Sequence, residues 1–306
     1  MRVFVTGASG YIGYAVAKAF RRHGHDVAGM VRNKGKARML EAVEIKPVIG
    51  DLEKPDSYRD ILDTCEVFVH CALEPSPRGQ ELDARTINTF FHQTKTLNLP
   101  RVFLYTAGAW VWGNTTGTLI DEGYPMHPIE FVRWRREHIE MILQNRDPFT
   151  RTIVICPGVV YGGSKGLTAQ WFHDTLSGEI QIVGSGENHW AMVHVKDLAQ
   201  AYVLAAEKEL DRVILNIVDH SRNTVKEMTE ALTHITPRAC HVRSLSAQEA
   251  FDRFGPLAEG LKIDQTISND RAFRLLDWKP RHPTFLEDLT RYYNAWHCHV
   301  EHKHHG

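Results

Sequence analysis

The stretch that decides the fold is RVFVTGASGYIG, residues 2–13. Its opening run, Arg2 to Thr6, is mostly β-branched or aromatic, as expected of a buried strand. A glycine-rich turn follows, and an amphipathic run from Tyr11 to Arg22 predicts a helix. A strand, a glycine turn and a helix in this order are typical of a dinucleotide-binding motif, in which the helix N-terminus binds the phosphates. We therefore expect the chain to bind a dinucleotide through Gly7, Ser9, Gly10, Tyr11, Ile12 and Gly13.

Each of the three glycines in this motif has a separate steric role. Gly7 permits the tight turn, Gly10 lets a pyrophosphate approach the backbone, and Gly13 lets the helix pack closely on the strand.

The composition of the chain argues against several classes of protein. A formal net charge of −1 leaves no broad basic field, so nucleic acid is not an expected partner. No apolar run approaches the roughly 18 residues of a membrane span, and we expect no signal peptide before the first strand. The 5 cysteines are scattered and include no C-x-x-C pair. These features indicate reduced thiols and a cytoplasmic protein.

The end of the second predicted strand favours NADP over NAD as the cofactor. This strand, residues 25–31, leads into Arg32-Asn33-Lys34-Gly35-Lys36. An enzyme that uses NAD usually carries an acidic residue here for the ribose 2′-hydroxyl, whereas cationic groups suit a 2′-phosphate. Arg32 and Lys36 are therefore predicted to bind the 2′-phosphate of NADP. An exposed basic turn, or stacking of Arg32 on the adenine, would also account for these residues.

The spacing T-G-x-x-G-x-x-G at residues 6–13 resembles that of the atypical and extended short-chain dehydrogenase/reductases, the NAD(P)-dependent epimerase/dehydratase-like family. The segments PGVVYG at 157–162, VHVKDLA at 193–199 and LLDWKP at 275–280 extend the resemblance to about residue 296. It implies that Asp51 and Leu52 contact the adenine and that Ala72 lies near the nicotinamide-side ribose. It also implies that Pro157, Val159 and Val160 meet the nicotinamide. Asp51 could instead cap a following helix.

The catalytic motifs of the resembled family are altered in this sequence. Where the family has a serine, this chain has Gly108, and Thr106 is the nearest remaining hydroxyl. The family's Tyr-x-x-x-Lys pair falls on Val132 and Arg136, or one residue earlier on Phe131 and Arg135, so neither register supplies a phenol. An arginine can bind ribose hydroxyls, but its pKa is too high for it to exchange protons near neutrality.

Three residues are the candidates for catalysis, namely Thr106, Tyr161 and Arg136. His194 has a suitable intrinsic pKa for a proton donor. His194 and Asp197 are also explained as residues that fix a strand-to-helix junction. We expect no metal site.

These observations predict an α/β fold, a doubly wound parallel Rossmann sheet of about seven strands with a smaller C-terminal mixed substrate lobe. Residues 1–160 would form the NAD(P)-binding core, 161–190 an insertion of the substrate lobe, and 191–220 the return to the core. Residues 221–296 would form most of the substrate lobe, and 297–306 a flexible His-rich tail. Helices at 81–97 and 129–143, with Phe90, Phe91, Ile139 and Ile142, could pair two copies into a homodimer.

The predicted function is that of an NADP-dependent oxidoreductase or sugar-epimerase-like enzyme that lacks the Tyr-x-x-x-Lys pair. Its substrate would be a small-molecule carbonyl compound or a sugar nucleotide. The alternative is a non-enzymatic NADP-binding sensor or interaction protein.

Overall fold

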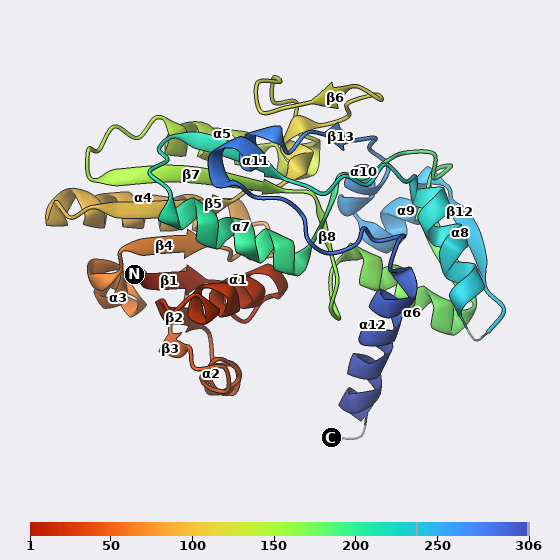
Figure 1. The fold of residues 1–306 in the computed structure, drawn as a ribbon, viewed down its shortest axis with the longest axis horizontal. Coiled ribbons are helices and arrows are strands. Elements are labelled where there is room, and N and C mark those ends of the chain that lie inside the picture. The colour runs from red at the N-terminus through yellow and green to blue at the C-terminus, as the bar shows by residue number, and fades with distance from the viewer. Residues whose placement is uncertain (237, 305–306) are drawn as a thin grey trace. The chain divides into compact units, whose positions relative to one another are not determined.

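The computed structural model describes residues 1–236 and 238–304, which fold into two compact units (Figure 1). Unit 1 comprises Met1–Ala107, Trp134–Cys156 and Leu198–Leu215, and unit 2 comprises Gly108–Arg133, Pro157–Asp197 and Asn216–Gly306. The helices, with 3-10 helices written η, are α1 (Tyr11–Arg22), α2 (Lys34–Glu41), η1 (Pro55–Ser57), α3 (Arg59–Thr64), α4 (Gly79–Leu97), η2 (Ala109–Trp112), η3 (Glu130–Val132), α5 (Trp134–Leu143), α6 (Leu167–Ser177), α7 (Val195–Glu207), α8 (Val225–Ile235), α9 (Ala247–Phe254), α10 (Leu257–Leu261), α11 (Asp270–Leu276) and α12 (Leu289–His304). The strands are β1 (Arg2–Thr6), β2 (Asp26–Val31), β3 (Lys46–Ile49), β4 (Val67–His70), β5 (Arg101–Thr106), β6 (Leu119–Ile120), β7 (Thr150–Pro157), β8 (Val159–Tyr161), β9 (Glu179–Val183), β10 (Met192–His194), β11 (Val213–Ile217), β12 (His241–Leu245) and β13 (Thr266–Ile267).

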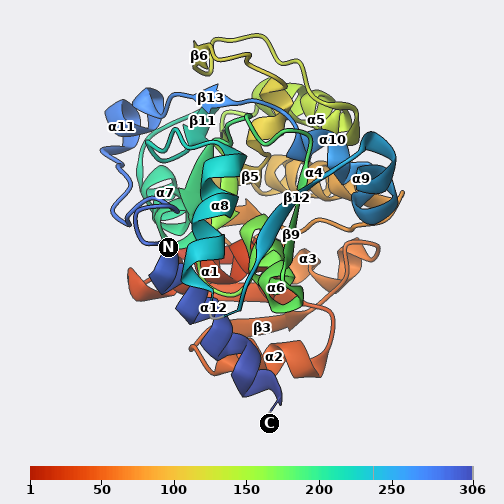
Figure 2. The ribbon, with the colours of Figure 1, turned by 90° about the vertical axis from the view of Figure 1, so that its right-hand side faces the viewer.

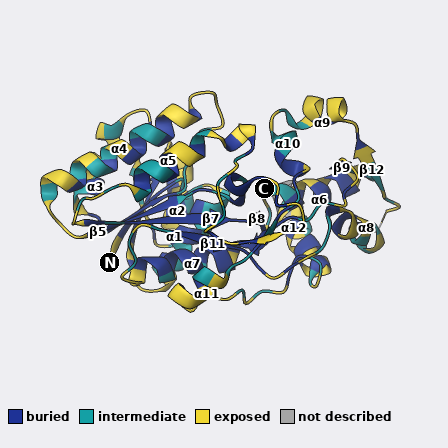
Figure 3. Ribbon diagram, turned by 90° about the horizontal axis from the view of Figure 1, so that it is seen from above, coloured by how far each residue is buried: buried dark blue, intermediate teal, exposed yellow. Residues whose placement is uncertain are grey.

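A 7-stranded parallel sheet in the order β11-β7-β5-β4-β1-β2-β3 forms the centre of the fold. The predicted doubly wound sheet is therefore confirmed. Its central strands are continuous apolar runs because helices cover both faces. Figure 3 shows α4 and α5 on one side of the sheet and α7 on the other, with buried residues turned inward. The carboxyl ends of parallel strands share one edge, where ligands bind in open α/β sheets.

Aromatic stacking fills the core of unit 1 around Phe68. Its ring lies 5.7 Å from that of Phe4, 5.1 Å from Phe90 and 5.3 Å from Phe103. Phe90 therefore packs into the sheet, and Ile139 and Ile142 on α5 are likewise buried. Three of the four side chains that were expected to offer a dimer surface are unavailable for it, because their helices use this stripe to cover the sheet.

Unit 2 has a core of its own. Strands β9 and β12 pair in parallel and lie beside α6 and α8 (Figure 2). Trp171 on α6 stacks on Trp190 with ring centroids 4.8 Å apart and planes at 10°. Trp296 on α12 is fully buried.

Helix α12 extends into the segment from residue 297 that is predicted to be a flexible His-rich tail. It continues to His304, and no proline or glycine interrupts it. Residues 305–306 lie outside the described residues. No helix in the described part of the chain is both long and apolar enough to cross a membrane.

Candidate active site

The turn between β1 and α1 is tight enough to require glycine at two positions. The Gly10 N–H donates to the carbonyl oxygen of Gly7 at 2.8 Å. Gly7 has φ +68°, and a Cβ there would lie 2.8 Å from the main-chain nitrogen of Ala72. A Cβ on Gly13 would lie 2.3 Å from the Gly7 oxygen. No side chain caps the start of α1, so its first N–H groups can bind an anion.

A cavity of about 470 Å³ opens within unit 1 at the carboxyl ends of β1, β2, β3 and β4. Such a volume lies within the usual range for small-molecule and cofactor sites. The structure brings most of the predicted cofactor-binding residues together on its wall, namely Gly7, Ser9, Gly10, Tyr11, Ile12, Gly13, Arg32, Lys36, Asp51, Leu52 and Ala72. Thr106 does not line this cavity. The cavity wall also lacks Pro157, Val159 and Val160. Pro157 is buried at the end of β7, and Val159 and Val160 are buried in β8.

Acidic residues accompany the basic residues on the cavity wall. Arg32 Nη1 lies 3.2 Å from Glu74 Oε2, and Glu53 Oε1 accepts from Arg78 Nη1 at 2.7 Å. Asp51 Oδ1 accepts a hydrogen bond from the Glu53 N–H at 2.9 Å, so its side chain closes a local turn rather than capping α3. Sequence reasoning missed Glu74 as the partner of Arg32, because the two residues are 42 positions apart and the strand order brings their loops together.

Thr106, at the end of β5, is the centre of a second group of polar contacts. Its hydroxyl oxygen lies 2.7 Å from the hydroxyl of Tyr202 and donates to Cys71 Sγ at 3.2 Å. Its carbonyl oxygen accepts from Arg135 Nη1 at 2.8 Å. Cys71 also lines the cavity of unit 1. Through Cys71, the half-buried Thr106 side chain adjoins the wall of that cavity.

The two arginines considered for the lysine position of the family lie on different faces of α5. Arg135 is buried and contacts Thr106, and its guanidinium carbon lies 4.5 Å from the ring centroid of Trp134. Arg136 is exposed, and its Nε donates to Glu140 Oε1 at 2.8 Å on the outer face of the helix. Successive helical residues point about 100° apart, so only one of the two can face the sheet. Arg135, not Arg136, therefore lies beside Thr106.

Behind Arg135 lies a buried polar network that the sequence analysis did not anticipate. Asp83 Oδ1 lies 3.1 Å from His70 Nε2, and Asp83 Oδ2 lies 2.7 Å from His138 Nδ1. The Tyr105 hydroxyl donates to Asp83 Oδ2 at 2.7 Å and accepts from Arg135 Nη1 at 3.2 Å. Burial alone would raise the pKa of Asp83, but the hydrogen bonds from both histidines and the charge of Arg135 hold it below its usual value.

The network extends from Asp83 back to the cofactor cavity. His70 Nδ1 lies 2.7 Å from Thr6 Oγ1, and that oxygen accepts from the Ala72 N–H at 3.4 Å. Ala72 lines the cavity. With the ring proton of His70 on Nε2, that N–H donates to Asp83 Oδ1 and Nδ1 accepts from the Thr6 hydroxyl. The arrangement of Thr6, His70 and Asp83 is not a nucleophile site, because Thr6 is fully buried.

Two expected proton donors are enclosed in unit 2. The Tyr161 hydroxyl donates to Asp219 Oδ2 at 2.9 Å and also contacts the Pro283 carbonyl oxygen at 3.0 Å. Burial and the Asp219 carboxylate raise the pKa of Tyr161. Burial, with the neighbouring His282, lowers the pKa of His194 to about 3. Tyr161 has no exposed surface, and His194 is neutral near pH 7.

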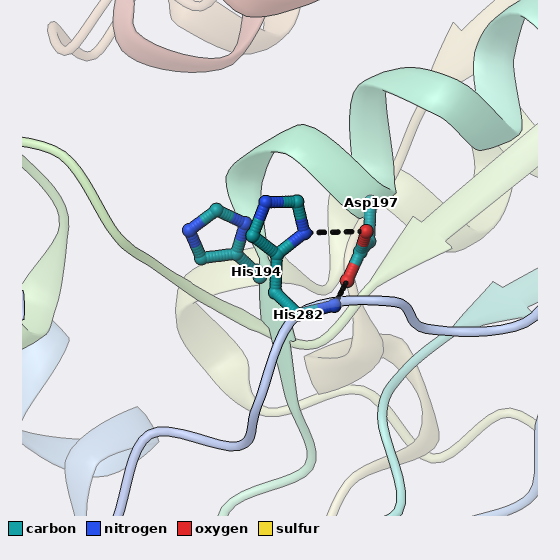
Figure 4. A group of neighbouring side chains, drawn as sticks. All are labelled: His194, Asp197 and His282. Atoms are coloured by element: carbon teal, nitrogen blue, oxygen red, sulfur yellow. Dashed lines mark hydrogen bonds and ion pairs between the residues drawn. The ribbon is translucent and has the colours of Figure 1, made fainter. Parts of the chain in front are cut away.

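His194, Asp197 and His282 form a compact group in unit 2 (Figure 4). His282 Nδ1 lies 2.8 Å from Asp197 Oδ1, and Asp197 Oδ2 accepts from the Arg281 and His282 N–H groups at 3.0 Å. The two imidazole rings stack with centroids 3.9 Å apart and planes at 19°, and one ligand atom from each of the three residues lies within 4.8 Å of the others. The group ties residues 281–282 to the start of α7, which agrees with a structural role for Asp197.

The model of the NAD dependent epimerase/dehydratase family matches residues 3–217. The chain belongs to this family. It is 28% identical over 296 residues to an uncharacterized protein of Schizosaccharomyces pombe, covering 95% of this chain and 98% of that one. It is 24% identical to the 4-hydroxy-2-methyl-3-oxo-4-farnesyl-3,4-dihydroquinoline-1-oxide ketoreductase of Stigmatella aurantiaca, over 68% of this chain and 65% of that one.

The fold is also that of solved members of the class. The dTDP-glucose 4,6-dehydratase of Bacillus anthracis, solved in complex with NAD, superposes with a TM-score of 0.81 at 17% identity and covers 98% of both chains. Family membership makes this protein an enzyme of the epimerase/dehydratase class, with an oxidoreductase-like function in a family that is NAD dependent.

Proposed function

We propose that this protein is an NADP-dependent oxidoreductase that reduces a small-molecule carbonyl compound, and that it does so without a Tyr-x-x-x-Lys pair. The observation that carries the proposal is the cavity in unit 1, which joins a glycine turn to Arg32 and Lys36. Thr106 adjoins the same cavity through Cys71. The ketoreductase among the relatives supports a carbonyl as the substrate class.

The residues on the cavity wall fit a dinucleotide in an extended arrangement. The glycine turn and the start of α1 would hold the pyrophosphate, because no side chain caps the first N–H groups of the helix. Asp51 and Leu52 would contact the adenine, and Ala72 the second ribose. Pro157, Val159 and Val160 stay predictions for the nicotinamide side. When bound, the nicotinamide supplies the hydride.

Arg135 takes the role of a ribose-binding residue in this proposal. Among the described residues its hydrogen bonds use Nη1 alone, directed to Tyr105 and Thr106. The remaining guanidinium N–H groups can donate to hydroxyl oxygens. Arg135 stays charged throughout the accessible pH range, so it orients a ligand and does not transfer a proton.

The preference for NADP is tested by measuring the dissociation constants of NADPH and NADH. We expect Arg32→Ala to weaken NADPH about tenfold or more, since one hydrogen bond to a charged group contributes about 1.5–3 kcal/mol, and to change NADH little. The matched control is Arg38→Ala, an exposed arginine on α2 that does not line the cavity. Equal losses for both cofactors in Arg32→Ala would mean that Arg32 stacks on the adenine.

The ion pair between Arg32 and Glu74 gives a second test with the opposite sign. A 2′-phosphate must displace Glu74 as the partner of Arg32 and would then lie close to its carboxylate. Glu74→Gln is therefore expected to strengthen NADPH binding and leave NADH binding unchanged.

Turnover is tested with NADPH and a panel of aromatic aldehydes, aliphatic ketones and sugar nucleotides. Absence of turnover with every compound would refute the proposed function.

A further inference from the structure

The hydroxyl of Tyr202 is directed at Thr106 from inside the core of unit 1. Tyr202 lies on α7 with its side chain fully buried, and its oxygen is 2.7 Å from Thr106 Oγ1. Either hydroxyl can be the donor in this contact, and when the Thr106 hydroxyl donates to Cys71 Sγ, the Tyr202 hydroxyl is the donor to Thr106. A phenol thus lies behind the one hydroxyl left near the altered catalytic motif.

Tyr202 differs from Tyr105 and Tyr161 in what its hydroxyl contacts. The hydroxyl of Tyr105 donates to Asp83, and that of Tyr161 donates to Asp219, so both protons are held by carboxylates. The Tyr202 hydroxyl instead contacts the Thr106 hydroxyl and the Cys71 thiol. The other titratable groups around it are the thiols of Cys71 and Cys156.

We propose that Tyr202 supplies the proton for carbonyl reduction through the hydroxyl of Thr106, in place of the tyrosine of the Tyr-x-x-x-Lys pair. This inference rests on the proposed function. Thr106 would contact the substrate oxygen by turning its O–H from Cys71 to that oxygen. Tyr202 would act one step behind it.

The proton balance of this relay is complete. Hydride addition to the carbonyl carbon breaks the C=O π bond and leaves an alkoxide. The Thr106 O–H bond breaks as its proton passes to the alkoxide oxygen, and the Tyr202 proton moves to Thr106 Oγ. The phenolate that remains takes a proton from water by the reverse route after the alcohol leaves.

The surroundings of Tyr202 and Cys71 keep both groups protonated until a stronger base forms beside them. Burial raises the pKa of Tyr202, and burial raises the pKa of the Cys71 thiol to about 11, so both groups stay protonated near neutrality. An alkoxide is a stronger base than a phenolate and therefore draws the proton along the relay. Arg135 donates a hydrogen bond to the Thr106 carbonyl oxygen and so holds a fixed positive charge at the main chain of the central residue of the relay.

The experiment uses the full chain with NADPH and whichever carbonyl of the panel it reduces fastest. We expect Tyr202→Phe to lower kcat by about 10²–10⁴-fold, with the NADPH dissociation constant changed less than twofold. Thr106→Val should lose the same factor, Thr106→Ser should retain most activity, and the double variant should lose no more than either single one, because the two act as a unit. Tyr58→Phe, which removes a buried phenol at the start of α3, is the matched control.

Two measurements separate a relay from a structural role. A solvent deuterium isotope effect should report two protons in flight in the wild type and fewer in Tyr202→Phe. The 13Cζ resonance of Tyr202 should shift in Thr106→Val without any ligand. Full activity of Tyr202→Phe, multiplicative losses in the double variant, or parallel loss of NADPH binding would overturn the relay and leave the proposed function intact. A wild-type chain that binds NADPH but reduces no carbonyl would overturn both.

Discussion

Replacing Asp83 with asparagine should destabilise the protein more than any exposed charge on the same helix. Asp83 accepts hydrogen bonds from His70, His138 and Tyr105 inside unit 1, and its side chain is 3% exposed. An asparagine keeps one acceptor oxygen and turns a donor toward at least one of these donors. It also leaves the buried Arg135 without its nearby carboxylate charge.

The size of the effect follows from these contacts. Removing one partner of a buried charged network costs about 3–5 kcal/mol, because the remaining polar groups stay buried without partners. We therefore expect Asp83→Asn to lower the free energy of unfolding by about 3–5 kcal/mol. Glu81→Gln on α4 is the matched control, because Glu81 is half exposed and pairs with Arg85 at the surface, where such pairs contribute at most about 1 kcal/mol.

The assay is urea unfolding followed by circular dichroism and by tryptophan fluorescence. The double variant of Asp83→Asn with His138→Gln should lose less than the sum of the two single losses, since the residues share one bond. A free energy of unfolding for Asp83→Asn within 1 kcal/mol of that of Glu81→Gln would refute the network as a source of stability.

Three further outcomes are expected. Gly13→Ala should destabilise unit 1 in a thermal melt, because its Cβ would lie 2.3 Å from the Gly7 oxygen. The nearest contact of a Cβ on Gly10 is 3.0 Å, so Gly10→Val should keep the fold and abolish NADPH binding in a titration. Since the pKa of His194 falls from 6.5 to about 3 on folding, the free energy of unfolding should decline as the pH drops below 6.5, by up to about 1.4 kcal/mol per pH unit. In urea titrations between pH 6.5 and 4, His194→Gln should reduce the slope of that decline by the amount that corresponds to about one bound proton. Arg136→Ala should leave turnover within twofold of wild type while Arg135→Ala weakens NADPH binding; the reverse order would restore the other register of α5.

The sequence by itself determined those features that depend on neighbouring residues. The apolar run before Gly7, the glycine spacing and the amphipathic helix after it specify the first strand, turn and helix, because each rests on local backbone geometry and on a short hydrophobic period. Alternating strand and helix patterns then predict a parallel doubly wound sheet. The residues of the cofactor cavity follow from the same logic, since the carboxyl ends of the strands meet at one edge.

Only the tertiary structure decided which side chains meet around Thr106. Tyr202 is 96 residues away in the chain, and Asp83 is 22 residues from its partner Tyr105, so no local spacing links them. The crossover connections and the strand order bring these residues together. The choice of Arg135 over Arg136 likewise depends on which face of α5 packs on the sheet, and adjacent arginines carry no signal that separates them until that face is known.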